Sequence, residues 1–166
     1  MIVLGVDPGS QVTGYGVVSR TDAGTPRLLE CGVVRPPAAQ DMAHKLAVIH
    51  AEISRLIQRH HPDVLAIETV FVAHNARSAL VLGQARGVVV LAAAQASLTL
   101  AEYAPTVVKQ AVTGTGAATK TQVQQMVARL LRLASPPKPA DAADGVALAL
   151  THCLRSGRVL KRAVVG

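Results

Sequence analysis

Apolar residues along the chain form short runs and spaced patterns that predict alternating strands and helices. The run Ile2–Asp7 is almost wholly apolar and leads into the turn sequence Pro8-Gly9-Ser10, which is typical of a buried strand. Gly14–Ser19 and Arg27–Val34 follow as two further strands, and the short turn-rich connection between them favours an antiparallel meander. We therefore expect these three segments to lie side by side in one sheet.

The rest of the chain predicts helices that alternate with two more strands. From Asp41 to about His60 apolar residues recur at helical spacing, and Pro62 closes that helix. Further strands are expected at Asp63–Glu68 and Leu98–Tyr103. The other helices are expected at residues 75–96, 105–112, 119–133 and 140–154. The order of elements predicts an α/β fold, a mixed five-stranded sheet flanked by helices, in a single domain over residues 1–166.

Composition excludes several classes of protein. Half of the 166 residues are hydrophobic, which is incompatible with a disordered chain, and the length allows a substantial core. Two distant cysteines, Cys31 and Cys153, offer neither a disulfide framework nor metal-ligand spacing and indicate a reducing cytoplasm. The start of the chain has no secretory signal pattern, and the most apolar stretch, Val88–Ala94, is shorter than the ~18 residues of a membrane span. We expect a cytoplasmic protein with no membrane partner.

The positive charge is concentrated in the last third of the chain. The net charge is +7, yet residues 1–102 hold eight Lys and Arg against eight Asp and Glu. Residues 103–166 hold nine Lys and Arg against only two acids. A basic region of this kind favours a polyanionic partner such as nucleic acid, although a solvated basic surface is an equally good explanation from charge alone.

Four acids lie where their charge needs an explanation. Asp7 and Glu68 each end an apolar strand, where an unpaired charge would be costly to bury. If these two strands are neighbours, the two carboxylates converge at one edge of the sheet. Asp141 and Asp144, three residues apart at the start of a helix, share one helical face. Carboxylates gathered in this way suit Mg²⁺, and two ions about 3.5–4 Å apart would support phosphoryl transfer.

Two of these acids also have simpler local explanations. Asp141 could cap the last helix, because Asp is favoured near the positive end of the helix dipole. Asp7 could belong to the turn made by Pro8 and Gly9. Glu68 has no comparable local role, since Glu is favoured neither in strands nor in turns. Taken together, the four acids favour a metal site over four separate structural roles.

Several ordered motifs resemble one known family. The segment DPGSQVTGYG at residues 7–16 resembles the opening motif of the RuvC family of Holliday junction resolvases. The resemblance continues through IETVF (67–71), ALVLGQARG (79–87), VVKQ (107–110), KTQVQ (120–124) and DAADGVA (141–147). It therefore spans nearly the whole chain, and an ordered series of motifs is far more specific than any single one.

The resemblance implies a ribonuclease H-like fold and a homodimer that nicks two strands of a four-way junction symmetrically, in homologous recombination and DNA repair. It implies dependence on Mg²⁺, with Mn²⁺ as a substitute, and the branch-migration complex RuvA-RuvB as a partner. By the family's pattern Asp7, Glu68 and Asp141 are catalytic metal ligands, with Asp144 as the fourth acid. Some members of the family carry His at this last position, which leaves the role of Asp144 the least defined.

Three further residues gain a role from the resemblance. Phe71 lies three residues beyond Glu68, and the family uses an aromatic there, so it is expected to stack on an unpaired base at the junction. Such stacking is worth about 1–3 kcal/mol. From the sequence alone, the default interpretation of Phe71 is a core residue, and the resemblance reverses that preference. Lys109 and Lys120 are expected to bind DNA phosphates, whereas without the resemblance each is simply a surface lysine.

The long helix predicted after the fourth strand is apolar on nearly all sides between Ala79 and Ala96. A helix that packs on its own sheet has no reason to be apolar on its other side unless something covers it. Gly83 and Gly87 would let another element approach closely, and we interpret this face as the dimer interface. The alternative is that the basic C-terminal helices of the same chain cover it.

Two other functions would also fit parts of this sequence. A sugar-kinase-like or actin-like ATPase also opens its phosphate site with Asp-x-Gly after a first strand, but that fold needs two such domains and 166 residues are too few. A junction-binding module that has lost catalysis is the other alternative. The four intact acids argue against such a module, and cleavage of a junction by the protein would exclude it.

Overall fold

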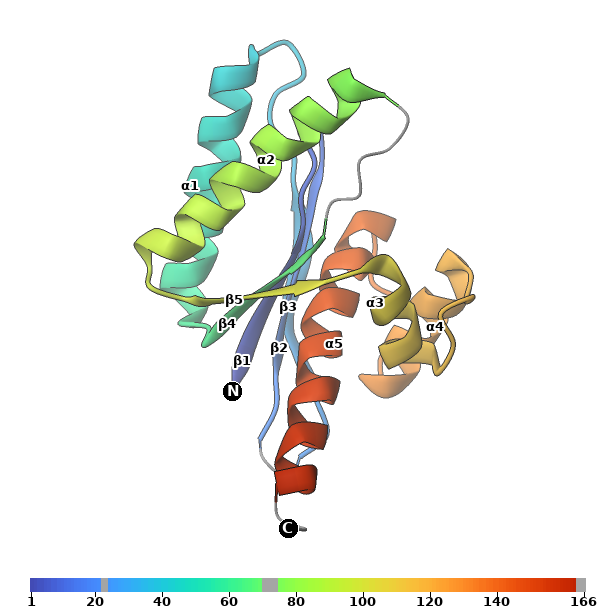
Figure 1. Cartoon of the computed structure of the whole chain (residues 1–166). Coiled ribbons are helices and arrows are strands. Elements are labelled where there is room, and N and C mark those ends of the chain that lie inside the picture. Colours follow the sequence, from blue (N-terminus) through green and yellow to red (C-terminus); the bar gives the residue numbers. More distant parts are fainter. Residues whose placement is uncertain (22–23, 70–74, 164–166) are drawn as a thin grey trace.

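The computed structural model describes residues 1–21, 24–69 and 75–163, which form a five-stranded sheet with helices on both faces (Figure 1). The strands are β1 (Ile2–Asp7), β2 (Thr13–Ser19), β3 (Arg27–Val34), β4 (Val64–Glu68) and β5 (Thr99–Tyr103). Their order in the sheet is β3-β2-β1-β4-β5. The first three strands pair antiparallel, as predicted, while β1, β4 and β5 run parallel. The predicted mixed sheet is thus confirmed.

The helices also follow the sequence pattern, with differences at two ends. They are α1 (Met42–His60), α2 (Ala76–Gln95), α3 (Pro105–Thr113), α4 (Lys120–Leu130) and α5 (Ala140–Ala163). Helix α4 ends three residues earlier than predicted, and the left-handed backbone of Arg132 soon turns the chain away. Helix α5 runs nine residues beyond the predicted end at residue 154, because no proline interrupts the chain after Pro139.

Strand β1 lies at the centre of the sheet, and its alternating side chains belong to two separate cores. Leu4 and Val6 are fully buried in the core that α1 and α2 form on one face. Val3 is fully buried in the core on the other face, with residues of α3, α4 and α5. The same alternation places Asp7 on the α5 face of the sheet, because residues 3, 5 and 7 of β1 lie on that face.

Among the residues that the structure describes, helix α2 is covered on one side only. Its buried residues, Ala85, Val89, Ala92 and Ala93, belong to the core shared with α1. Helices α3 and α4 pack around α5 beyond the opposite face of the sheet, so the alternative that they cover α2 is wrong (Figure 1). Leu80 and Leu91 on α2 remain 71% and 49% exposed.

By length and composition alone, α2 is also the one helix in the described residues that could cross a membrane. Only 22% of its most apolar 18-residue window is buried. In this fold, however, α2 connects the parallel neighbours β4 and β5 and packs on α1. The expectation from the sequence, that no stretch is long enough to span a membrane, therefore fails for α2 on length and composition.

Candidate active site

Two carboxylates stand side by side at the carboxyl edge of the sheet. Asp7 ends β1 and Glu68 ends β4, and these strands are parallel neighbours with Val6 paired to Ile67. Glu68 has the parity of Ala66, which belongs to the core on the α5 face, and Asp7 has the parity of Val3. Both carboxylates therefore face α5 from adjacent strand ends, as the sequence predicted they would if the strands were neighbours.

The start of α5 lies almost directly on the backbone of β2. A Cβ at Gly145 would lie 2.5 Å from the Cα of Tyr15, and one at Gly14 would overlap the carbonyl oxygen of Asp141. Only glycine allows this approach, because any side chain would push the helix away from the sheet. The glycines of the 7–16 and 141–147 motifs thus hold the acids of α5 close to the end of β1.

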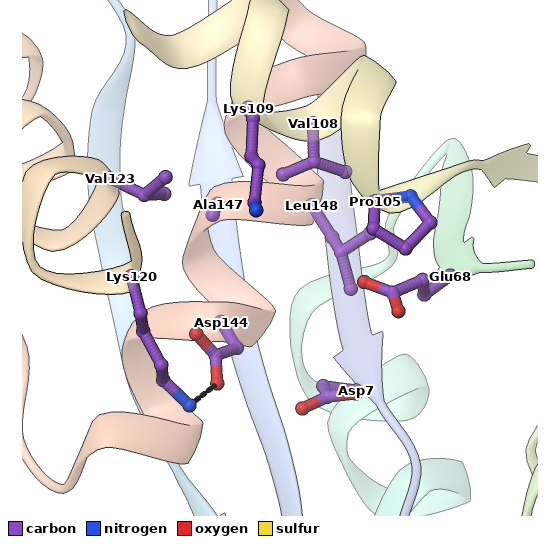
Figure 2. Close-up of a pocket in the computed structure, with 10 residues that line it drawn as sticks. All are labelled: Asp7, Glu68, Pro105, Val108, Lys109, Lys120, Val123, Asp144, Ala147 and Leu148. Atoms are coloured by element: carbon purple, nitrogen blue, oxygen red, sulfur yellow. Dashed lines mark hydrogen bonds and ion pairs between the residues drawn. The ribbon is translucent and has the colours of Figure 1, made fainter. Parts of the chain in front are cut away.

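A pocket of about 250 Å³ opens where these elements meet. Figure 2 shows the carboxylates of Asp7, Glu68 and Asp144 directed towards one space, with Lys109 and Lys120 reaching it from α3 and α4. The other lining residues form an apolar wall, namely Pro105, Val108, Val123, Ala147 and Leu148. The structure therefore brings together three of the four predicted acids and both predicted lysines.

The Lys120 side chain is already engaged in this pocket. Its Nζ donates to Oδ2 of Asp144 at 2.6 Å (Figure 2). Lys120 is the first residue of α4, which a capping box at Thr119 and Gln122 fixes in place. The pairing brings a positive charge to the edge of the carboxylate group, and the pKa of Lys120 is raised by this hydrogen bond and by the charges of Asp144, Asp141 and Asp7.

The pKa of Asp7 is raised to about 7. Burial is the largest cause, followed by the charges of Asp144 and Glu68, with Asp141 adding a smaller contribution and Lys120 opposing the shift. None of these causes is a hydrogen bond within the turn after β1, so the alternative that Asp7 serves only that turn does not account for its raised pKa. Asp7 lies instead at the centre of a group of mutually repelling carboxylates.

The pKa values of the neighbouring carboxyls shift in the same direction. Burial raises the pKa of Glu68, the charge of Asp144 adds to it, and Lys109 and Lys120 lower it. Burial also raises the pKa of Asp144, against the hydrogen bond from Lys120. Each acid is therefore held in its charged form at an energetic disadvantage, which a bound cation would relieve.

Asp141 lies near the pocket but does not line it. It is in the first turn of α5, where its charge interacts favourably with the helix dipole. In the described part of the chain its carboxylate accepts no hydrogen bond from a backbone N–H, so capping does not account for it. Its charge raises the pKa of both Asp7 and Asp144, which places it within electrostatic reach of the pocket.

The carboxylates suit a divalent cation by their chemistry, although they are not arranged as a closed set of ligands. Within residues 1–21, 24–69 and 75–163 no three or more His, Cys, Asp or Glu side chains are grouped so as to hold one ion. The donors are carboxylate oxygens only, which is the set preferred by hard cations such as Mg²⁺. A cation that entered between Asp7, Glu68 and Asp144 would compete with Lys120 for Asp144. The residues therefore fit a divalent metal by the chemistry of their donor atoms.

One residue predicted for the site lies outside the described structure, and the site also contains residues that the sequence did not predict. Phe71 falls in the segment 70–74, which the structure does not describe. The apolar wall that Pro105, Val108 and Leu148 provide was not anticipated from the sequence. A signal for it exists in retrospect, because Leu148 follows Asp141 and Asp144 on the same face of α5 at helical spacing.

Comparisons with known proteins agree along nearly the whole chain. A family model described as crossover junction endodeoxyribonuclease RuvC matches residues 3–152. A protein of that name from Chromohalobacter salexigens is 54% identical over 160 residues, which cover 96% of this chain and 84% of the relative.

Solved structures give the same result. The Thermus thermophilus RuvC structure matches with a TM-score of 0.88 and 35% identity, over 96% of this chain and 97% of that one. T. thermophilus RuvC in complex with a Holliday junction substrate matches with a TM-score of 0.86 and 33% identity, over 94% and 95% of the two chains.

Proposed function

The chain belongs to the RuvC family of crossover junction endodeoxyribonucleases, and from that premise we propose that its carboxylate pocket is where it cuts four-way junction DNA. The enzyme is a structure-specific endonuclease with a ribonuclease H-like fold that resolves Holliday junctions, and its family is one of divalent-metal nucleases. The alternative of a sugar-kinase-like or actin-like ATPase is thereby set aside. Residues 1–166 act as one nuclease domain in this proposal.

The observation that carries the proposal is the meeting of Asp7, Glu68 and Asp144 with two lysines in one pocket. We assign these three acids, together with Asp141 from the first turn of α5, to hold the divalent metal. Mg²⁺ is the expected metal because the donors are all carboxylate oxygens, with Mn²⁺ as a substitute and two ions in each site. When bound, the ions supply charge neutralisation at the reacting phosphate and activation of the attacking water.

The two lysines bind the phosphates of the DNA strand. Lys109 is unpaired with any acid among the ion pairs of the described residues, whereas Lys120 is paired with Asp144. When the strand enters, its phosphate replaces the carboxylate as the partner of Lys120, and Asp144 becomes available to the metal. A phosphate could not approach three carboxylates without such positive charge beside them. Phe71 is proposed to stack on a base beside this strand, as the family's pattern implies.

We propose that two copies of the chain associate through the outer face of α2. A Cβ built at Gly83 or Gly87 would meet no atom of the described residues within 4 Å, so this face offers room for a second helix. Leu80 and Leu91 on the helix are large, apolar and exposed. A two-fold dimer presents two equivalent pockets, which suits a junction whose arms are related by a two-fold axis.

A protein partner and a cellular location complete the proposal. The branch-migration complex RuvA-RuvB is proposed as a partner from the family alone. A cytoplasmic location is proposed because Cys31 and Cys153 are both free thiols and the substrate is DNA.

A gel assay tests the proposed function. Purified protein is incubated with an end-labelled four-way junction and with a linear duplex of matching sequence, each in Mg²⁺ and in EDTA. The proposal requires paired nicks that occur only in the junction and only with metal. Junction binding without nicks would identify a recognition module, and equal cutting of both substrates would identify an ordinary nuclease; either result contradicts the proposal.

A further inference from the structure

A second groove borders the catalytic edge of the sheet on the α2 side. It has a volume of about 400 Å³ and lies between the loop that follows Asp7 and the first two turns of α2. Its lining residues are Gly9, Ser10, Arg77, Ser78, Val81 and Leu82. Helices α2 and α5 cover opposite faces of the sheet (Figure 1). The groove is lined by residues of α2 and the carboxylate pocket by residues of α5, so the two flank the end of β1 from its two sides.

Arg77 is a cation in an unfavourable position. It lies in the first turn of α2, where the helix dipole favours anions and disfavours positive side chains. That turn contains no acidic residue, and among the ion pairs of residues 1–21, 24–69 and 75–163 none involves Arg77. The guanidinium is exposed beside the groove. An anion bound there would pair with the Arg77 guanidinium, and its negative charge would interact favourably with the positive end of the helix dipole.

Both walls of the groove are held in place by hydrogen bonds. The buried Thr13 donates to the Gly9 carbonyl at 2.8 Å and accepts from the Gly9 N–H at 3.2 Å, which closes the loop after Asp7. On the other wall the Asn75 side chain accepts from the N–H groups of Arg77, at 2.9 Å, and Ser78, at 3.3 Å. The groove is therefore a preformed feature of the fold.

The carboxylate pocket creates a need for positive charge on this side. Before metal neutralises them, the three carboxylates repel the phosphates of an approaching strand, and the two lysines that line the pocket, Lys109 and Lys120, offset this repulsion from the α3 and α4 side. Ser10 lies three residues beyond Asp7 in the chain and lines the groove together with Arg77. At that point Arg77 supplies a guanidinium, which matches phosphate geometry with two parallel donors.

We propose that this groove binds a backbone phosphate of the same DNA strand that the carboxylate pocket cuts, with Arg77 and the Ser10 hydroxyl as its ligands. The proposal rests on the proposed function and adds a phosphate site to it. Val81 and Leu82 form the apolar floor, against which the sugar of the neighbouring nucleotide packs. Because the contact is made to the backbone, it strengthens binding for every junction sequence.

The salt dependence of junction binding tests this site. Affinity is measured between 50 and 300 mM salt, in Ca²⁺ to prevent cutting, for the parent protein, Arg77→Ala, Arg77→Lys and the control Arg55→Ala. Arg55 is also an exposed helical arginine, but it lies on α1 and pairs with Glu52. Each phosphate contact contributes about 0.9 to the slope of log K against log salt. Arg77→Ala should lower that slope by about 0.9 for each groove that engages DNA, with roughly five- to tenfold weaker binding at 0.1 M salt.

A chemical change in the DNA provides the matching test. Single uncharged methylphosphonates are placed at each of the three phosphates on either side of the nick. One position should weaken binding of the parent protein and have no further effect on Arg77→Ala, while Arg77→Lys keeps most of the parent slope. The proposed site would be overturned if Arg77→Ala and Arg55→Ala gave the same salt slope of binding. It would also be overturned if every methylphosphonate weakened binding of Arg77→Ala as much as it weakens binding of the parent protein. A parent protein that neither binds nor cuts junctions would instead overturn the proposed function.

Discussion

At Asp7 the chain keeps a carboxylate where folding alone would favour a neutral side chain. Burial and the charges of Asp144 and Glu68 raise its pKa from 3.8 to about 7. The folded protein therefore holds this proton more tightly than the unfolded chain does. As pH rises from about 4 to 7 the unfolded chain releases the proton first, so the free energy of unfolding falls over that range and stays low above it.

Asp7→Asn removes this penalty and should stabilise the protein as pH rises. With EDTA present, the unfolding free energy of the variant should exceed that of the parent, and the gap should widen by roughly 2–3 kcal/mol between pH 5 and pH 8. Urea unfolding at the two pH values measures it. Glu52→Gln, at an exposed acid on α1, is the control and should show no such trend. A gap that is constant with pH would mean that Asp7 is not the strained acid described above.

Lys120 should compete with metal in the free protein and assist binding in the presence of DNA. Its Nζ bonds to Asp144 at 2.6 Å, so Lys120→Met leaves that carboxylate free. We expect the variant to bind Mn²⁺ severalfold more tightly without DNA, as measured by electron paramagnetic resonance of free Mn²⁺. Junction affinity in Ca²⁺ should fall and its salt slope should decrease by about 0.9. Weaker Mn²⁺ binding by Lys120→Met would refute the exchange of partners.

The sequence indicated which residues form the pocket but not how they are paired. Strand ends predicted that Asp7 and Glu68 converge if their strands are neighbours, and helical spacing placed Asp144 on one face of its helix with Asp141. The family resemblance implied that these two pairs of acids form one site. The Lys120–Asp144 pair was not predictable, because it depends on how α4 packs beside α5. The position of Asp141 outside the pocket lining, and the groove beside Arg77, likewise follow from helix placement rather than from local pattern.

At the scale of elements, hydrophobic periodicity predicted most boundaries because each strand and helix buries a defined face. The ends of β1 and β3 agree with the prediction to the residue, and α1 begins directly after its cap at Asp41. The C-terminal ends of α4 and α5 differ from the ends predicted from the sequence. Arg132 adopts a left-handed backbone that its sequence does not signal, and α5 continues past Cys153, the last buried position described in it.

The contact between α5 and the sheet depends on glycines that no helix or strand preference would select. Gly145→Ala would bring a Cβ to 2.5 Å from the Cα of Tyr15, so α5 must move. Overpacking of this kind destabilises by about 1–3 kcal/mol. We expect that loss in urea unfolding, together with a fall in cleavage rate at a pH and temperature where the variant is fully folded, because Asp144 moves with the helix.

Gly116→Ala is the matched control for that change. The nearest atom to its Cβ would be the Thr106 carbonyl oxygen at 3.5 Å, which is an ordinary contact. This variant should unfold and cut much as the parent does. Parent-like cleavage by Gly145→Ala would show that the close approach of α5 does not position the acids.

In the molecule as a whole, the carboxylate pocket proposed as the active site lies on the α5 face of the sheet, and none of the described residues covers the outer side of α2 on the opposite face. This division lets two copies join through α2 without covering either pocket. A single chain offers one site, whereas resolution of a junction needs two coordinated nicks. The exposed apolar face of α2 and the family's reaction therefore point to the same assembly.

Leu80→Glu should break that assembly without unfolding the chain, because the side chain is 71% exposed. Analytical ultracentrifugation should show the parent as a dimer and the variant as a monomer at low micromolar concentration. The variant should leave junctions with single, unpaired nicks in place of paired ones. Arg55→Ala, on the separate helix α1, should remain dimeric. A dimeric Leu80→Glu, or a monomeric parent that makes paired nicks, contradicts the α2 interface.

In the proposed mechanism, the carboxylate pocket cuts the junction with the aid of metal while other residues bind the DNA. The most direct measurement compares cleavage in Mg²⁺ and junction affinity in Ca²⁺ for Asp7→Asn and the parent protein. We predict that cleavage falls by more than about a hundredfold, since even the outer partners of metal ligands typically cost 10–100-fold. Junction affinity should stay within about twofold of the parent, because the phosphate contacts come from the lysines and Arg77. If cleavage persists, or if binding is lost together with it, Asp7 is a structural acid and the pocket is not the catalytic site.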